Sequence, residues 1–354
     1  MRRPLPNRRV LAALNLLTSV RGTEMLYKDY VLDPLAKDAQ VACDRHEVHF
    51  RPIGDALTPK KRGEVDAIVV IGGDGTLSSV AHEVLARPAW RDVPIAVLPA
   101  GFRNGLAASL GVLEPRATVR ALLKGEPRAT PTFRVAADGE LVAHMLGALH
   151  FGTFADALVT AHRLLALSQE SAFIAEPPQR QLLGILRHAL LHPRRMPCAL
   201  EYEDAATGRT VAVEGPLRLV ALSHAPWEHY GYTLAPGAAL DGRLHVTYAT
   251  AAATRGRMFH LLRHEACEQR ILAEDGVATA VARRATVTFR WGPATPPSLL
   301  AALRGDALDT LDADGGRVEM ATLDGELCPF SPRAGASSVR VTVEPGPSVQ
   351  LLRP

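Results

Sequence analysis

The chain has 354 residues, 47% of them hydrophobic, and a formal net charge of +3. This is a globular composition, long enough for a sizeable core that we expect to be divided between two domains. Basic residues cluster in 2–9, 60–62 and 187–195 without interleaved aromatic residues. That distribution argues against a nucleic-acid partner and favours an anionic substrate or an acidic membrane surface.

Cysteine usage and hydropathy bear on the compartment. The cysteines are far apart and lack metal-ligand spacing, which predicts buried thiols in a reducing, cytoplasmic environment: Cys43, Cys198, Cys267 and Cys328. The start resembles a signal peptide, but the apolar run 10–17 is short and contains Asn15, so we interpret it as a first strand. No stretch approaches the ~20 apolar residues of a spanning helix. Any membrane contact is therefore expected to be peripheral.

Strands and helices alternate through the first third of the chain. We expect a mixed helical segment over 23–42 and strands at 9–15, 46–50, 66–71 and 93–98. Such alternation predicts an open parallel sheet with helices on both faces and ligands at the carboxyl ends of its strands.

After 125–127 the pattern changes to strands separated by polar turns, which predicts a mainly antiparallel second domain. The expected strands are 132–137, 141–149, 197–202, 210–213, 217–223, 244–249, 285–291 and 317–323. A helical stretch over 179–196 has leucines on one face beside arginines; it could rest on lipid headgroups or simply cover the second domain. We interpret 293–316 as an inserted loop with one short helix.

The most informative stretch is Gly72-Gly73-Asp74-Gly75-Thr76, between a buried strand and an amphipathic helix. A glycine turn at a helix N-terminus presents free amides that favour a phosphate. Asp74 in this turn suggests metal-assisted phosphoryl transfer, because its charge would otherwise repel the phosphate. The alternative is a plain turn in which the aspartate caps the helix.

A second glycine turn follows the next expected strand, in 98–110. It contains Gly101, Phe102, Arg103 and Asn104 and opens another helix. Turns at adjacent strand ends should face one crevice.

These motifs resemble the diacylglycerol kinase catalytic-domain family, which includes sphingosine and ceramide kinases, and more distantly NAD kinases. The second glycine turn is similar to that of sphingosine kinases, and 222–244 resembles the family's middle segment. Thr322-Leu323-Asp324-Gly325-Glu326 matches its late acidic signature, although a hairpin turn alone would give the same pattern. Asn15 stands where the family has an Asn-Pro.

The resemblance implies an α/β fold with a parallel-sheet nucleotide-binding domain (1–128, with 339–354 returning) and a β-rich lipid-binding domain (129–338). The active site would lie in the cleft between them. The implied reaction is transfer of the ATP γ-phosphate to a lipid hydroxyl with Mg²⁺. The implied catalytic residues are Asp74, Asp324 and Glu326, with Asp74 and Glu326 also holding the metal. The implied nucleotide-binding residues are Asn15, Gly72, Gly73, Gly75, Thr76, Gly101, Arg103 and Asn104, and Asp156 would meet the lipid head group.

Three departures from the family pattern qualify this prediction. Phe102 and Arg103 replace a small hydroxyl residue and a glycine, although Arg103 could pair with a phosphate. Where the family has an asparagine or histidine followed by a glutamate, this chain has Ser78 and Ser79. The carboxylates expected after Asp156 are missing, which favours a neutral head group, as in diacylglycerol or ceramide, over a sphingoid amine.

Other functions stay open on the sequence alone. A lipid-binding protein of this fold that has lost catalysis is one alternative, and an NAD kinase, supported by the first motif only, is another. A homodimer is compatible with the sequence. We set aside a metal pair at His260 and His264 and a hydrolase site at 223–241, because neither has the flanking motif that such chemistry needs.

Overall fold

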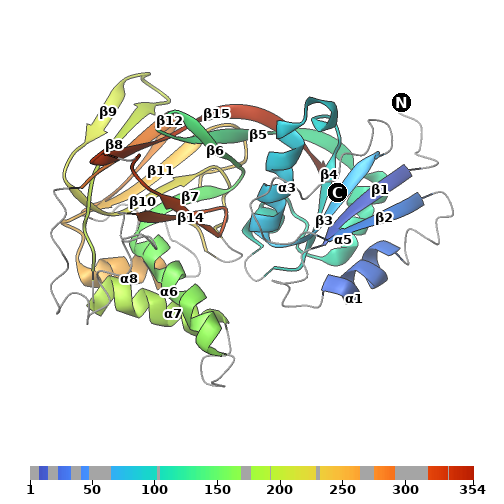
Figure 1. The fold of residues 1–354 in the computed structure, drawn as a ribbon, viewed down its shortest axis with the longest axis horizontal. Coiled ribbons are helices and arrows are strands. Elements are labelled where there is room, and N and C mark those ends of the chain that lie inside the picture. The colour runs from blue at the N-terminus through green and yellow to red at the C-terminus, as the bar shows by residue number, and fades with distance from the viewer. Residues whose placement is uncertain are drawn as a thin grey trace.

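Figure 1 shows the computed structural model, which describes residues 8–14, 23–32, 41–47, 65–101, 104–168, 177–191, 193–228, 232–263, 275–291, 318–333 and 335–354. Fifteen strands in these ranges form one sheet. Its main path runs β14-β13-β7-β10-β11-β12-β15-β4-β3-β1-β2. The expected inserted loop over 293–316 lies outside the described residues.

One end of this sheet is parallel. It contains β1 (Arg8–Leu14), β2 (Val41–Glu47), β3 (Ala67–Gly72) and β4 (Ile95–Pro99). The helices of this part are α1 (Thr23–Tyr27), α3 (Asp74–Ala86), α4 (Gly105–Ser109) and α5 (Pro115–Lys124), with a π segment Lys28–Leu32 and a 3₁₀ turn Pro88–Trp90. All of β3 and β4 is buried, as expected for apolar strands covered on both faces.

The predicted parallel strands are confirmed, with one shift. Val41 and Ala42, expected at the end of a helical segment, begin β2 and pair with Arg8 and Arg9 of β1. Pairing with a neighbouring strand outweighs the weak local helical pattern there.

The other end of the sheet is antiparallel. Its strands are β5 (Glu126–Ala137), β6 (Glu140–Met145), β7 (Ala148–Gly152), β8 (Met196–Asp204), β9 (Thr210–Val213), β10 (Pro216–Ser223), β11 (Leu244–Thr250), β12 (Val277–Arg290), β13 (Glu319–Leu323), β14 (Glu326–Phe330) and β15 (Ser338–Arg353). Helices α6 (Thr153–Ser168), α7 (Pro177–Ile185) and α8 (Arg255–Arg263), with the π segment Leu186–Leu191, lie together below it in Figure 1.

Four sequence boundaries were wrong in this part. Strand β5 begins at Glu126 rather than 132, because its first residues pair with the end of β15. The strand expected over 141–149 is two strands, because the amides of residues 146–148 turn toward the side chain of Asp324. The helix expected to reach Met196 stops earlier, since Met196 already pairs with β10. Strand β12 begins at Val277 rather than 285, because its first residues pair with β11.

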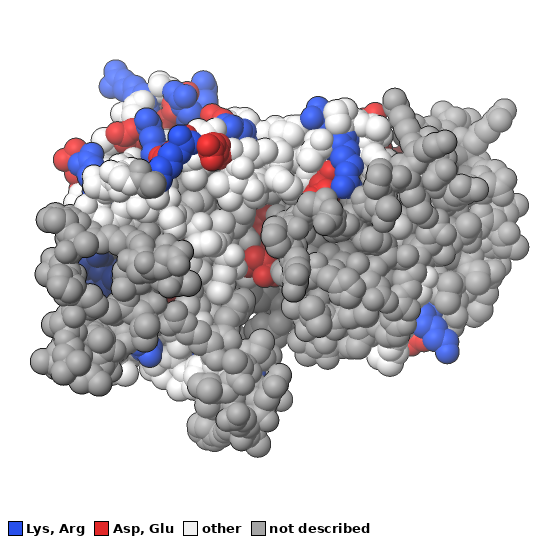
Figure 2. Space-filling model, viewed as in Figure 1, with Lys and Arg blue, Asp and Glu red and all other residues white. Residues whose placement is uncertain are grey.

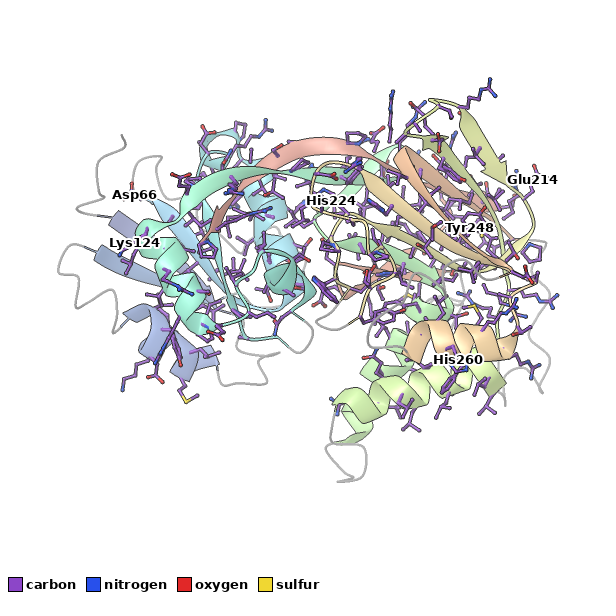
Figure 3. The ribbon with its side chains drawn as sticks, turned by 180° about the vertical axis from the view of Figure 1, so that it is seen from behind. Asp66, Lys124, Glu214, His224, Tyr248 and His260 are labelled. Atoms are coloured by element: carbon purple, nitrogen blue, oxygen red, sulfur yellow. The ribbon has the colours of Figure 1, made fainter. Side chains whose placement is uncertain are left out.

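Two long strands join the parallel and antiparallel parts. Strand β15 pairs with β12 over Ser338–Val343, and its far end places Leu351 beside Ile95 of β4. Strand β5 runs antiparallel to β15 along most of its length, and together they arch over the middle of the molecule (Figures 1 and 3). The last strand thus contributes to the core beside the parallel strands, where Val349 and Leu351 are buried.

Candidate active site

The two glycine turns touch. Ala100 N donates to Gly72 O at 2.9 Å. A Cβ on Gly101 would lie 2.3 Å from Gly73 Cα and 2.9 Å from Gly73 N, so the close approach requires glycine. Side by side, the turns bring the end of β4 against the N-terminus of α3.

The N-cap residue of α3 is a glycine. Gly73 has no side chain and makes no side-chain cap bond to the first turn. The amides of a helix N-terminus and the helix dipole favour an anion at this position. Thr76, in the first turn of α3, is buried, and its Oγ1 lies where a Cβ on Gly72 would be 2.6 Å away.

Asp74 caps a different helix from the one that the sequence suggested. Its Oδ2 accepts from Gly105 N at 2.7 Å and its Oδ1 from Leu106 N at 2.9 Å, so it holds the N-terminus of α4. Asn104 reaches this turn with φ of +48° and exchanges two hydrogen bonds with Gly101. The Asp74 carboxylate thereby ties the two glycine turns together.

Asp324 and Gly325 form the two-residue turn between β13 and β14, with φ of +49° and +87°. Asp-Gly favours this hairpin geometry. The Asp324 carboxylate is buried at the junction of the two parts. Gly147 N and Ala148 N donate to its Oδ1 at 2.7 and 2.8 Å, and Leu146 N donates to its Oδ2 at 2.9 Å.

Ser78 completes the set by donating its hydroxyl to Asp324 Oδ2. Burial raises the pKa of Asp324, while the bonds from Ser78 and the three amides oppose that rise. Four donors fill the lone pairs of the carboxylate. Ser78, a departure from the family pattern, therefore links α3 directly to the late acidic signature.

Glu326 reaches the first glycine turn. A Cβ on Gly75 would lie 2.2 Å from both Cγ and Oε1 of Glu326, so the side chain lies over Gly75 at the start of α3. This puts the carboxylates of Asp74 and Glu326 on the same turn. They are hard oxygen donors of the kind that Mg²⁺ takes together with nucleotide phosphates.

A small cavity lies between the two parts, with a volume of about 20 Å³. Residues of the glycine turns and of the antiparallel part line it: Asp74, Leu106, Gly147, Ala148, His150, Phe154, Trp227, Glu228, Thr322, Asp324 and Gly325. Figure 2 shows acidic side chains in a recess in the middle of the molecule, between its two parts.

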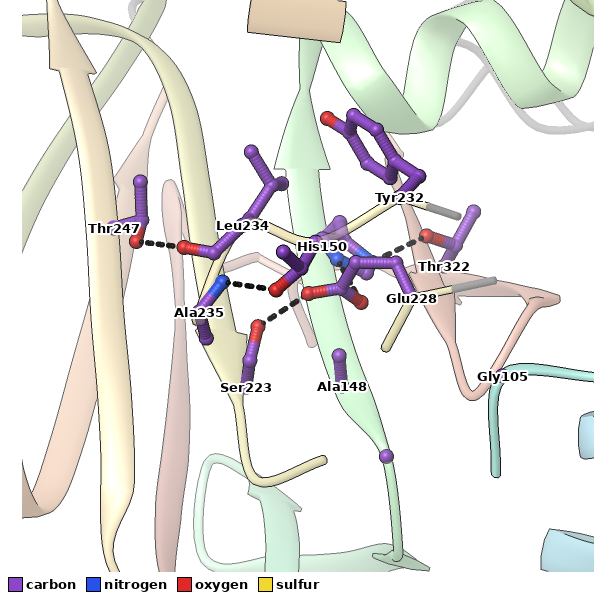
Figure 4. Close-up of polar contacts among 12 residues, drawn as sticks. Gly105, Ala148, His150, Ser223, Glu228, Tyr232, Leu234, Ala235, Thr247 and Thr322 are labelled. Carbon is purple, nitrogen blue, oxygen red and sulfur yellow. Dashed lines mark hydrogen bonds and ion pairs between the residues drawn. The ribbon is translucent and has the colours of Figure 1, made fainter. Parts of the chain in front are cut away.

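The sequence analysis missed a polar cluster in this cavity. His150 Nδ1 lies 3.2 Å from Thr322 Oγ1, and its Nε2 lies 2.8 Å from Glu228 Oε2. Ser223 Oγ donates to Glu228 Oε1 at 2.7 Å (Figure 4). The available signal was a polar residue, His150 or Thr322, inside a largely apolar strand.

The side chains of the hydrolase-like set make hydrogen bonds to other groups in the structure. Ser223 bonds to Glu228, and Asp241 Oδ2 accepts from Arg243 Nε at 2.6 Å. His224, labelled in Figure 3, has Nδ1 3.1 Å from Leu146 O and accepts from Gly242 N at Nε2. Burial lowers the pKa of His224 to about 4. It is a neutral structural histidine.

Asp156 does not line the cavity. It is buried in the first turn of α6, where Arg194 Nε and Nη2 donate to its two oxygens at 3.1 and 3.0 Å. Arg194 also bonds to buried Glu319 at 2.6 and 2.9 Å. Its role at a lipid head group stays a prediction. Asn15, Phe102, Arg103 and His264 lie outside the described residues.

The arrangement of a parallel sheet joined to an antiparallel sheet is also found in solved diacylglycerol kinase structures. The fold is similar to that of a diacylglycerol kinase structure from Bacillus anthracis str. Sterne, with TM-score 0.59 and 12% identity, covering 99% of this chain and 97% of that one. A second structure from this organism, titled a putative diacylglycerol kinase, gives 0.61 and 14%, with 99% and 98% covered.

Residues 23–135 match the diacylglycerol kinase catalytic domain, which confirms the resemblance predicted from the glycine motifs. Sphingosine kinase B of Dictyostelium discoideum is 29% identical over 126 residues, 34% of this chain and 16% of that protein. The probable lipid kinase YegS-like of Stenotrophomonas maltophilia (strain K279a) is 38% identical over 78 residues, 21% and 25%. Human sphingosine kinase 1 is 32% identical over 109 residues, 29% and 27%.

The matched segments span only 16% to 27% of these relatives' lengths. These relatives are lipid kinases, so the chain is related to lipid kinases at modest sequence identity. None of the helices in the described ranges is long and apolar enough to cross a membrane.

Proposed function

We propose that this protein is an ATP-dependent lipid kinase that transfers the γ-phosphate to a lipid hydroxyl. The observation that carries the proposal is the contact between the two glycine turns at the N-terminus of α3, with Glu326 beside Gly75. A helix N-terminus at a glycine turn suits the nucleotide phosphates, and a neighbouring cavity offers room for a hydroxyl group.

Mg²⁺ would be held by Asp74 and Glu326 together with the nucleotide phosphates. When bound, the ion would neutralise charge that develops on the transferred phosphoryl group. Gly72, Gly73, Gly75, Thr76, Gly101 and Asn104 surround the same turn, which supports their proposed role in nucleotide binding. The proposed roles of Asn15 and Arg103 rest on the sequence resemblance alone.

A neutral head group stays the favoured acceptor, since Asp156 is already paired with Arg194. Cytoplasmic location, peripheral membrane contact and a homodimer are further proposals that rest on the sequence.

One observation favours a second candidate, a lipid-binding protein without catalysis. Asp324 has all its acceptor capacity filled by Ser78 and three amides, so it could bind a substrate hydroxyl only after losing one of these bonds.

Transfer of labelled γ-phosphate from Mg²⁺-ATP separates these candidates. The acceptors are diacylglycerol, ceramide, sphingosine and monoacylglycerol in mixed micelles, and Glu326→Gln serves as the site variant, because it keeps the shape of the side chain and removes its charge. We expect label in one lipid and a loss of at least 100-fold in the variant, the lower end of what a positioned catalytic group contributes. Lipid binding without nucleotide binding or transfer would support the second candidate, and turnover of NAD would support an NAD kinase.

A further inference from the structure

The polar cluster in the cavity has the order of a proton relay. A carboxylate (Glu228), an imidazole (His150) and a hydroxyl (Thr322) follow one another at 2.8 and 3.2 Å (Figure 4). In this order an imidazole that is held by a carboxylate can accept a proton from a hydroxyl. Glu228 is itself fixed by Ser223 at 2.7 Å.

The burial of this cluster supports a role beyond packing. The side chains of His150 and Glu228 are only 4% and 3% exposed. Burial of a carboxylate is unfavourable without well-aligned partners, yet among the described residues His150 Nε2 has no aligned hydrogen bond, despite its short distance to Glu228. Catalytic hydrogen bonds are often misaligned in a free enzyme and tighten when substrate binds.

The position of the cluster points to the acceptor hydroxyl. Thr322 lies two residues before Asp324 on β13, and it lines the cavity together with Asp74 and His150. A volume of about 20 Å³ holds one water-sized group, which is the size of a hydroxyl. The lone pairs of Asp324 are filled, whereas the Thr322 hydroxyl and the His150 imidazole line this space and can exchange a proton with each other.

Building on the lipid kinase proposed above, we propose that Thr322 binds the acceptor hydroxyl and that His150 takes its proton. The acceptor's proton passes to Thr322 Oγ1 as the threonine proton moves to His150 Nδ1, and Glu228 stabilises the imidazolium. The lipid oxygen bonds to the γ-phosphorus while the bond from that phosphorus to the ADP oxygen breaks. ADP leaves with that electron pair, and His150 then returns its proton to water.

The test measures kcat, the KM for Mg²⁺-ATP and the KM for the lipid in Thr322→Val, Thr322→Ser and Glu228→Gln. Valine keeps the shape of threonine and removes the hydroxyl, and glutamine keeps the shape of Glu228 without its charge. The matched control is His188→Gln, since buried His188 makes a similar contact with Thr160 at 2.8 Å outside the cavity.

We expect kcat to fall at least 10-fold in Thr322→Val and Glu228→Gln, with the KM for Mg²⁺-ATP unchanged, because the relay handles only the acceptor's proton. Thr322→Ser should restore most of the rate. In a double variant that combines Thr322→Val with Glu228→Gln, the loss of kcat should be no larger than in either single variant, since the residues act as a unit. His188→Gln should keep the wild-type kcat.

Wild-type kcat in a folded Thr322→Val would overturn the relay and leave the lipid kinase proposal intact. If Thr322→Val does not fold, the kcat of Glu228→Gln takes its place, and a wild-type value there would overturn the relay. A wild-type protein that transfers no phosphate to any lipid overturns both proposals, so the two failures are distinguishable.

Discussion

Two glycines in the candidate site have different neighbours, and this predicts different effects of the same substitution. A Cβ on Gly101 would meet backbone atoms of Gly73, whereas the three atoms nearest to a Cβ on Gly75 all belong to the Glu326 side chain. A backbone cannot yield without separating the glycine turns, but a glutamate can rotate away. Gly101→Ala should therefore lower both the melting temperature and nucleotide affinity, while Gly75→Ala should reduce phosphate transfer with little loss of stability.

Thermal unfolding with and without Mg²⁺-ATP checks this contrast. Gly256→Ala is the matched control, since nothing lies within 4 Å of a Cβ there and the site is an exposed position of α8. It should leave the melting temperature unchanged or raise it slightly. Equal melting temperatures for Gly75→Ala and Gly101→Ala would contradict the prediction.

Buried histidines predict a loss of stability in mild acid. His224 Nε2 accepts from Gly242 N, so its protonation breaks that bond, and burial lowers its pKa to about 4. Burial, and then the nearby His82, lower the pKa of His144 to about 4 as well. Between pH 6.5 and about 4 the unfolded chain binds more protons, so the free energy of unfolding should fall as the pH falls through this range.

Urea unfolding at pH 7 and pH 4.5 measures this effect, and His224→Gln separates the contribution of one imidazole. Glutamine does not titrate, so the variant should lose less stability between the two pH values than the wild type. The same loss in both proteins would show that His224 is not responsible.

At the scale of elements, a buried ion network joins α6 to β13 through the segment before β8. Arg194 bridges Asp156 on α6 and Glu319 on β13. Burial opposes the charged form, but the two carboxylates outweigh it and hold the pKa of Arg194 above its usual value. Burial is also the main cause of the raised pKa of Glu319, which Arg194 opposes.

Arg194→Met should lower the free energy of unfolding by about 2–3 kcal/mol at pH 7, because it leaves two buried carboxylates unpaired. The control is Arg333→Met, whose partner Glu140 is 2.7 Å away in an exposed pair, and its effect should stay within about 1 kcal/mol. Urea unfolding of both variants gives the comparison. A smaller loss for Arg194→Met than for Arg333→Met would contradict the assigned role of the network.

At the scale of the molecule, the continuous sheet makes the two parts depend on each other. Leu351, near the end of the chain, is fully buried beside β4 in the core of the parallel part. Leu351→Ala should lower the free energy of unfolding by about 2–4 kcal/mol, as expected for a large-to-small change in a core.

Tryptophan fluorescence in urea is a suitable probe, because Trp90, one of the three tryptophans of the chain, is buried in the same core. Leu141→Ala is the control, because Leu141 is 46% exposed and should contribute little. Full stability in Leu351→Ala would show that the last strand does not support the parallel part.

Much of this architecture could be predicted from local patterns. Apolar runs such as 66–71 and 93–98 predicted buried parallel strands, and polar turns after residue 125 predicted the antiparallel part. Register and strand boundaries could not be predicted, because they depend on partners that are distant in sequence. Val41 joins β2 because it pairs with β1, and the expected strand 141–149 divides because Asp324 binds its amides.

The sequence by itself determined the two glycine turns, the late acidic turn and the family resemblance, because these depend on residue types at short spacing. Only the tertiary structure decided that Asp74 caps α4, that Asp324 is held by Ser78 and three amides, and that His150 meets Glu228 and Thr322. Those contacts join residues between 31 and 246 positions apart, and no local pattern encodes which of them the folded sheet brings together.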